Sequence, residues 1–354
     1  MARRALTLVA SLGLLMAAAA PAAAWNGKQN RYTVHNLQSD IPGLAAATDP
    51  DLVNGWGIAA GPASGPATPW WVSDNGTSKS TLYNGNTGAK LGLVVTIPGA
   101  PTGVVFNGTA DFQVNAGTGL KASLFIFDTD TGQIAGWNGV GTVAINKVTT
   151  ANSKYTGLAI GSTGGKNYLY AANFITAHVD VFDGSFTPAT LAGDFVDPRL
   201  PQGYAPFGIQ AIGNEIFVAY AKQSPDKHDE VVGKHRGFVS VFGMDGTFHG
   251  RVASRGVLDA PWGLAKAPAN FGKFSGDLLV GNFGDGRIHA YKWTSDGWKL
   301  HGTLRGPHDR PIVIEGLWGI GFGNGGAAGP TNTLYFAAGT DEEEHGLFGS
   351  ITAP

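Results

Sequence analysis

The sequence predicts an all-β protein built as a six-bladed β-propeller. Six times, a bulky residue or a threonine, a glycine and an aliphatic residue open a short apolar stretch: Trp56-Gly57-Ile58, Thr102-Gly103-Val104, Thr156-Gly157-Leu158, Phe207-Gly208-Ile209, Trp262-Gly263-Leu264 and Trp318-Gly319-Ile320. Subtracting successive glycine numbers gives steps of 46, 54, 51, 55 and 56 residues. A repeat near fifty residues with several β-runs is typical of propeller blades, because one small sheet cannot bury both of its faces alone.

Composition and periodicity support the same fold class. Glycine makes up 54 of 354 residues and charged residues only 14%, which favours tight turns and packed sheets over helices. No stretch of a dozen residues shows a convincing helical period of apolar positions. The chain contains no cysteine, which excludes disulfides, thiolate metal sites and a cysteine nucleophile.

The first 24 residues read as a signal peptide. Arg3 and Arg4 precede an apolar run over 5–20, and Ala22-Ala23-Ala24 suits cleavage before Trp25. We therefore expect an exported protein, periplasmic or extracellular, with no integral membrane segment after cleavage. The chain from 25 to 354 then forms one propeller domain.

The charge balance disfavours nucleic acid as a partner. Removing two arginines leaves 22 basic against 26 acidic residues, a formal net charge of −4. No basic run or stripe is present, and a nucleic-acid surface needs one.

Each blade is expected to contain four strands. In blade two we assign the second strand to 111–115 and the third to 123–127, and in blade three the pair Asp183-Gly184 turns into a fourth strand. Blade six ends at Pro354 after three strands, whereas 31–37 precedes the first repeat and has nothing else to pair with. We predict that this N-terminal strand completes the last blade and closes the ring.

Several units resemble NHL repeats in their second and third strands, as in 73–83, 172–182 and 281–291. The segments 267–285, 221–229 and 315–319 further resemble an uncharacterised bacterial family of exported NHL-like six-bladed propellers. That resemblance spans nearly the whole mature chain. It implies the fold and export, but no activity.

A column of polar residues is expected at one end of the central channel, where the second strands finish. It reads Asp74, Asn115, Asn173, Tyr220, Asn282 and Gly339. Such oxygens suit a divalent cation such as Ca²⁺, with Asp74, Asn173, Asn282 and Glu315 as candidate metal ligands. Alternatively, Asp and Asn cap their own turns.

Two polar loops on the same face carry further candidates. The loop at 223–236 contributes His228 and Asp229, and the loop at 340–345 contributes Asp341 and His345. Histidine near carboxylates can bind a divalent ion or transfer protons, so His228, His345 and Glu315 are the catalytic candidates. The tryptophans of the repeats are expected to pack between blades.

Two functions remain open from the sequence. The first is a binding scaffold whose polar channel mouth takes an unidentified protein, glycan or small molecule. The second is a metal-dependent hydrolase or lyase of the lactonase kind, in which the Asp/Asn column holds Ca²⁺ and His228 or His345 moves protons. Glu315, Asn173, Asn282 and Asp74 resemble the calcium-binding residues of gluconolactonase-type propellers, but their order and flanking residues differ. That family's Glu-Gly-Pro opening is absent here.

Overall fold

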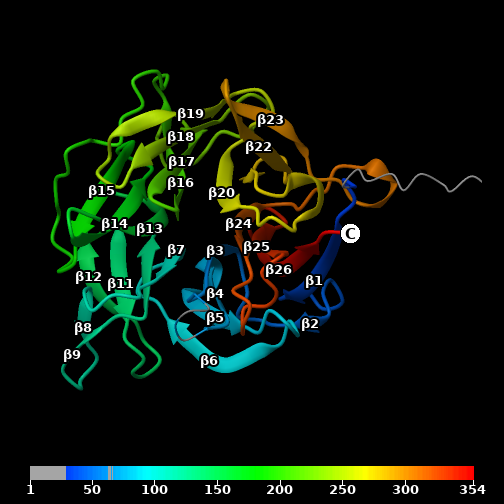
Figure 1. The fold of residues 1–354 in the computed structure, drawn as a ribbon. Coiled ribbons are helices and arrows are strands. Elements are labelled where there is room, and N and C mark those ends of the chain that lie inside the picture. Colours follow the sequence, from blue (N-terminus) through cyan, green and yellow to red (C-terminus); the bar gives the residue numbers. More distant parts are fainter. Residues whose placement is uncertain (1–28, 63–64, 66) are drawn as a thin grey trace, which may run out of the picture.

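Six small sheets surround a central channel in the computed structural model, which describes residues 29–62, 65 and 67–354 (Figure 1). The predicted signal peptide lies outside the described residues. Blade one comprises β3 (Gly55–Ala59), β4 (Trp70–Asp74), β5 (Lys79–Tyr83) and β6 (Lys90–Thr96). Blade two comprises β7 (Pro101–Phe106), β10 (Phe125–Thr129), β11 (Gln133–Trp137) and β12 (Ile145–Thr149). Blade three comprises β13 (Tyr155–Thr163), β14 (Lys166–Asn173) and β15 (His178–Asp183).

The remaining blades complete the ring. Blade four comprises β16 (Tyr204–Ile212), β17 (Glu215–Lys222), β18 (Phe238–Gly243) and β19 (Phe248–Ser254). Blade five comprises β20 (Pro261–Lys266), β21 (Leu278–Asn282), β22 (Ile288–Thr294) and β23 (Gly297–Thr303). Blade six comprises β24 (Leu317–Phe322), β25 (Thr333–Thr340), β26 (His345–Thr352), β1 (Thr33–Ser39) and β2 (Ala47–Thr48). Three short 3-10 turns lie at Asn75–Thr77, Gly272–Phe274 and Pro307–Asp309. The predicted six-bladed fold is confirmed.

The N-terminal strand closes the ring as predicted. β1 pairs antiparallel with β26, from Thr33 opposite Thr352 to Ser39 opposite Leu347 (Figure 1, blue beside red). The buried Ser39 hydroxyl donates to the carbonyl of Gly346 at 2.7 Å. Because the two ends of the chain share one sheet, the last blade has no free edge at β26.

The repeated glycines allow the inner strands to approach one another around the axis. A Cβ on Gly57 would lie 2.6 Å from the carbonyl oxygen of Thr102, and one on Gly319 would lie 2.7 Å from that of Trp56. Gly103, Gly208 and Gly263 approach the backbone of the next blade as closely, whereas a Cβ on Gly157 would lie 3.4 Å from the backbone of blade four. At five of the six repeats, glycine is therefore required by the close approach of one blade's backbone to the next.

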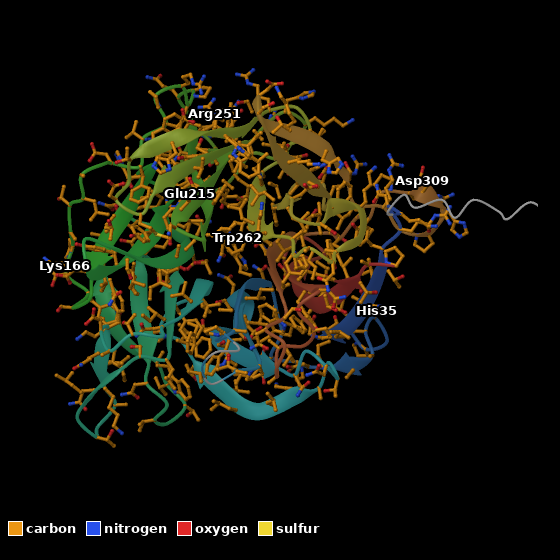
Figure 2. The ribbon with its side chains drawn as sticks, viewed as in Figure 1. His35, Lys166, Glu215, Arg251, Trp262 and Asp309 are labelled. Carbon is orange, nitrogen blue, oxygen red and sulfur yellow. The ribbon has the colours of Figure 1, made fainter. Side chains whose placement is uncertain are left out.

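Apolar clusters lie between neighbouring blades, and one further cluster fills the channel. The channel cluster contains the repeat aromatics Trp56, Phe207, Trp262 and Trp318, each at most 9% exposed. Trp318 stacks on Trp56 with ring centroids 3.6 Å apart, and Trp262 lies near the centre of the ring (Figure 2). The rings are buried as expected, but they pack against one another in the channel and not between neighbouring blades. We call this cluster the aromatic plug.

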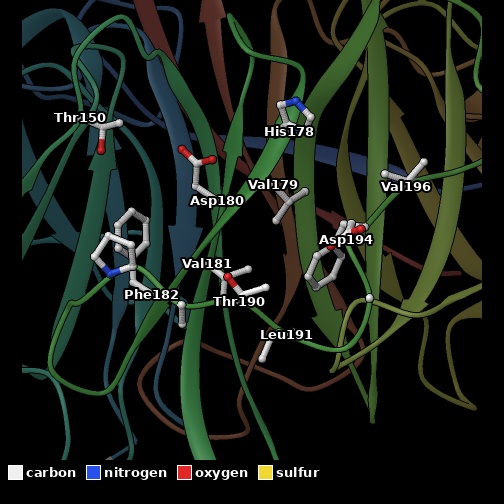
Figure 3. A pocket seen from close by; sticks show the side chains of 14 residues that line it. Thr150, His178, Val179, Asp180, Val181, Phe182, Thr190, Leu191, Asp194 and Val196 are labelled. Atoms are coloured by element: carbon white, nitrogen blue, oxygen red, sulfur yellow. The ribbon is translucent and has the colours of Figure 1, made fainter.

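Two strand assignments were wrong. In blade two, 113–115 and 120–122 form a separate hairpin, β8 (Gln113–Asn115) with β9 (Leu120–Ala122), and the second strand is β10. In blade three the expected fourth strand leaves β15 after a single bridge between Phe182 and Pro188. Gly193 then donates its N–H to the carbonyl of Asp245 in blade four. The outer edge of β15 consequently borders a cavity of about 620 Å³ (Figure 3).

Candidate functional site

Three residues of the expected polar column bond within their own blades. The carboxylate of Asp74 accepts the N–H of Thr81 at 2.8 Å, and the amide of Asn173 donates to the carboxylate of Asp180 at 2.8 Å. The amide of Asn282 donates to the carboxylate of Asp285 at 2.9 Å. All three are at most 1% exposed. The structure therefore brings them to one end of the ring but turns each side chain back onto its own turn.

Asn115 lies outside the column, whereas Tyr220 occupies its expected place: it pairs with Pro206 just as Asp74 pairs with Gly55 and Asn282 with Pro261. Asn115 stands on the exposed β8–β9 hairpin, where its side-chain oxygen accepts the N–H groups of Gly117 and Gly119. The strand that ends beside the channel in blade two is β10, so the placement of Asn115 in the column was wrong; Thr129 pairs there with Pro101. Tyr220 is buried between blades three and four, where burial raises the pKa of its hydroxyl.

Of the loop candidates, Asp229 joins a new cluster and the others do not. The ring of His345 lies 2.7 Å from the carboxylate of Asp40, which holds β26 against the end of β1 and raises the pKa of His345. Glu315 and Asp341 are exposed. His228 is also exposed, and only its backbone carbonyl takes part in the cluster, as the acceptor of a bond from Lys154 at 2.8 Å.

The cluster lies above the aromatic plug, on the face where the inner strands begin. We call it the acidic mouth and define it by Asp130, Lys154, Asp229, Glu230 and Glu343, together with Asn54 and Asn75. Asn54 donates to the carboxylate of Glu343 at 2.7 Å and accepts from the indole N–H of Trp318 at 3.1 Å. It thereby links the mouth to the plug.

Lys154 is the cation that the mouth carboxylates face. Its ammonium lies 3.3 Å from the carboxylate of Asp229. Its charge also opposes the upward shift in the pKa values of Asp130, Glu230 and Glu343. Blades two, three, four and six therefore contribute charged groups to one site.

Burial works against ionisation of these carboxyls. Burial is the largest cause that raises the pKa of Glu230, to about 7, and the nearby charge of Glu343 adds to it. Burial likewise raises the pKa of Glu343 and of Asp130. A carboxyl that is desolvated and faces other carboxyls loses part of its preference for the charged form. In the folded protein, the ionised form of these carboxyls is therefore destabilised.

The turn that carries Glu343 has an unusual backbone. Asp341, Glu342 and Glu343 have φ values of 53°, 55° and 71°, and Asn54, which bonds to Glu343, has a φ of 48°. Non-glycine residues rarely adopt this left-handed region, and such residues collect at functional sites because the fold must stabilise them. The unusual backbone conformation is therefore found in the residues that bring Asn54 and Glu343 together.

Another buried carboxyl lies beside the channel itself. Asp128 in β10 accepts the hydroxyl of Thr102 at 2.9 Å and the N–H of Gly103 at 2.6 Å. It is fully buried, and burial raises its pKa to about 7. Asp128 holds the inner strand of blade two in place and is not part of the acidic mouth.

The two ends of the channel differ in character. The aromatic plug lies beneath the acidic mouth, whereas the opposite end opens as a cavity of about 650 Å³. The latter halves of all six inner strands line that cavity, mainly with aliphatic side chains such as Val105, Ile160 and Ile320. The candidate polar site is therefore at one end of the channel and the open apolar space at the other.

Sequence reasoning missed most of the acidic mouth. Glu230 and Glu343 lie in the two loops that it singled out, but neither was chosen as a site candidate. Asp130 was missed because the strands of blade two were shifted by one place: it follows β10, the true second strand. The signal for Asn54 and Lys154 was their position two residues before Trp56 and Thr156 of the repeats, where the chain enters an inner strand.

The described residues were also compared with the requirements of a metal site and of a membrane-spanning helix. Within the described ranges, three or more His, Asp or Glu side chains nowhere come together in a way that could hold a metal ion. Across the same ranges no helix has the length and apolar character needed to span a membrane.

Comparison with other proteins corrects the expected family. No family model matches the chain. It is 32% identical over 338 residues to the uncharacterised protein R648 of Acanthamoeba polyphaga mimivirus, covering 90% of this chain and 80% of that protein. It is 33% identical over 341 residues to protein L690 of the same virus, covering 90% and 85%.

These relatives are viral, so the assignment to a bacterial family was wrong. The sequence pattern of strands and turns that suggested a bacterial family is one that propeller blades share because of their fold. Among solved structures, the soluble aldose sugar dehydrogenase of Escherichia coli is similar with a TM-score of 0.53 at 13% identity, covering 91% of this chain and all of that one. A glucose dehydrogenase has the same TM-score at 14% identity, with the same coverage. Both likenesses concern the fold alone.

Proposed function

The chain belongs to the same family as the mimivirus proteins R648 and L690, and for this member we propose a binding function in which the acidic mouth holds a positively charged ligand. The observation that carries the proposal is the pair of contacts that form the mouth, Lys154 with Asp229 at 3.3 Å and Asn54 with Glu343 at 2.7 Å. The pKa values of Asp130, Glu230 and Glu343 support it, because burial raises all three. With Asp229, four carboxylates oppose one ammonium, a net charge of −3 when all are ionised.

A cation suits this site better than other ligands do. An anion would add to the repulsion among the carboxylates, and a neutral ligand would leave that repulsion unchanged. A protonated amine would offset it and donate charge-assisted hydrogen bonds in several directions. The strained turn at 341–343 supports the same conclusion, because holding Glu343 in the mouth has a conformational cost that only a function would maintain.

The proposal is tested by calorimetric titration with spermidine, with butane-1,4-diol as the uncharged control. Binding of a cation favours the ionised carboxyls, so affinity should rise as the pH increases from about 5 to about 8, through the pKa of Glu230. The variant Glu343→Gln should lower the affinity about tenfold. Glu344→Gln is the matched control, since Glu344 is an exposed residue of the same turn.

Two results would overturn the proposal. One is the absence of spermidine binding at about pH 8, where the carboxyls are ionised. The other is equal affinity in the wild type and in Glu343→Gln, because the bound amine would then lie outside the mouth.

The enzyme interpretation is a second candidate, favoured by one observation. A carboxyl with a pKa of about 7, such as Glu230, can both accept and donate a proton near neutral pH, as general acid–base catalysis requires. Hydrolysis of lactones should then be lost in Glu230→Gln. The Ca²⁺-dependent form of this candidate also predicts a melting temperature that rises with Ca²⁺. Absence of lactone turnover both with and without Ca²⁺ would eliminate the candidate.

The cellular location is also a proposal: the first 24 residues support export. A cationic start, an apolar run and a small-residue cleavage site support export of the propeller. N-terminal sequencing of protein recovered from a periplasmic or culture fraction should begin at Trp25.

A further inference from the structure

An exposed tryptophan pair lies on the hairpin between β22 and β23. Trp293 is 63% exposed, and it is the one aromatic among the strongly exposed large hydrophobic residues of the described chain. Its cross-strand neighbour is Trp298, with ring centroids 5.4 Å apart at 69°. These two residues differ from the repeat tryptophans, which are buried in the aromatic plug. An exposed aromatic of this size usually marks an interaction site.

The pair borders a cleft between blades four and five. The cleft has a volume of about 770 Å³ and a floor of Phe217, Val241 and Leu278, all at most 5% exposed. β19 and β23 lie beside each other there (Figure 1). The volume is in the range of small-molecule sites, and the floor is already formed and dry.

The rim of the cleft carries both hydrogen-bond donors and acceptors. The carboxylate of Glu215 lies 3.0 Å from the ring of His249, and both side chains are more than 40% exposed. The ammonium of Lys266 lies 5.8 Å from the ring centre of Trp298 and has no carboxylate partner among the described residues. Arg251 also lines the cleft, but its guanidinium is paired with Asp197; Figure 2 marks Glu215 and Arg251.

The cleft is separate from the acidic mouth. Ile212 and Lys266 line both the cleft and the open apolar end of the channel, which is the end away from the mouth. A ligand in the cleft would therefore not contact Glu230 or Glu343. Binding in the cleft is thus independent of binding in the acidic mouth.

We propose that this cleft binds a saccharide, with one sugar ring lying over the indole of Trp293 and its hydroxyl groups reaching Glu215, His249 and Lys266. A pyranose ring has an apolar C–H face and a polar edge, which matches a flat aromatic wall beside mixed donors and acceptors. A purely aliphatic ligand would remove the rim groups from water without giving them hydrogen bonds.

The test is saturation-transfer NMR and calorimetric titration of the full mature chain with maltotriose, cellotriose, chitotriose and trigalacturonate. At least one should bind with a Kd of about 1 mM, the range expected for a single stacked ring. Trp293→Ala should weaken that binding at least about tenfold, and Glu215→Gln should weaken it without altering the aromatic wall. Leu120→Ala, which removes an exposed apolar side chain on the remote β8–β9 hairpin, should leave it unchanged.

The variants are expected to fold, because Trp293 is largely exposed and Glu215 is bonded only to an exposed histidine. Equal melting temperatures of the wild type and Trp293→Ala would confirm this. Failure of all four saccharides to bind at about 10 mM overturns the proposal, as does binding that Trp293→Ala does not change. Self-association that is lost in Trp293→Ala, with no saccharide binding, would show that the cleft is a protein contact and would also overturn it.

Discussion

Replacing Glu230 by glutamine tests the electrostatics of the acidic mouth through the stability of the fold. The pKa of Glu230 is raised from 4.5 to about 7, a difference of 2.5 units. At about 1.36 kcal/mol per unit, ionisation of Glu230 costs the folded state up to about 3 kcal/mol. Because the residue is only partly buried, solvent screening lowers the expected value to about 1–3 kcal/mol.

The sign follows from the raised pKa. Below about pH 4.5 Glu230 is protonated in both the folded and the unfolded chain, so it carries no penalty. Between about pH 4.5 and 7 the unfolded chain releases its proton first, and the free energy of unfolding of the wild type falls as the pH rises. Glutamine has no such dependence, so Glu230→Gln should become more stable than the wild type by about 1–3 kcal/mol at pH 8 while matching it near pH 4.

The assay is urea denaturation of both proteins at several pH values from about 4 to 8, with Glu344→Gln as the control at an exposed position. Only the difference between the variant and the wild type is interpreted, since other groups titrate in the same range. A difference that is flat with pH, or a variant less stable than the wild type at pH 8, would refute the account of Glu230 as a desolvated carboxyl.

Three further predictions concern the fold. In thermal unfolding, Gly316→Ala should lower the free energy of unfolding by more than about 2 kcal/mol, because φ is +61° and a Cβ would collide with the carbonyl of Gly339. Gly165→Ala is the control: its φ is +73° but the space around it is open, so the loss should be about 1 kcal/mol. Asp40→Asn should move the pKa of His345 back toward its ordinary value, as measured by NMR titration of the histidine signals. An unchanged pKa would contradict the contact with Asp40. Trp318→Ala should cost about 3–5 kcal/mol in urea denaturation because it opens a cavity in the aromatic plug, and a loss below about 1 kcal/mol would show that the plug contributes little.

The predictable features are those that repeat. The glycines of the six units could be recognised because every blade meets its neighbour in the same way, and one backbone contact is repeated around the ring. Closure by 31–37 could be predicted because the last unit was one strand short. Blade two was misassigned because a polar hairpin at 113–122 interrupts the repeat with a strand-like pattern of its own.

The candidate site was only partly predictable. The Asp and Asn residues at the ends of the second strands were visible in the sequence, but their side chains bond to the nearest turn. That local competition is decided by geometry that residue type does not reveal. Glu230 and Glu343 lie 113 positions apart in the chain, and nothing in either loop indicates that their charges interact.

The sequence by itself determined the number of blades, the backbone contacts that require glycine and the strand that closes the ring, because these depend on local patterns repeated at a fixed period. The tertiary structure alone decided which carboxyls share the acidic mouth, that Trp293 and Trp298 stand beside an open cleft, and which end of the channel is filled. Those features arise where loops from different blades meet, and there both the distance between charges and their access to water depend on the closed ring.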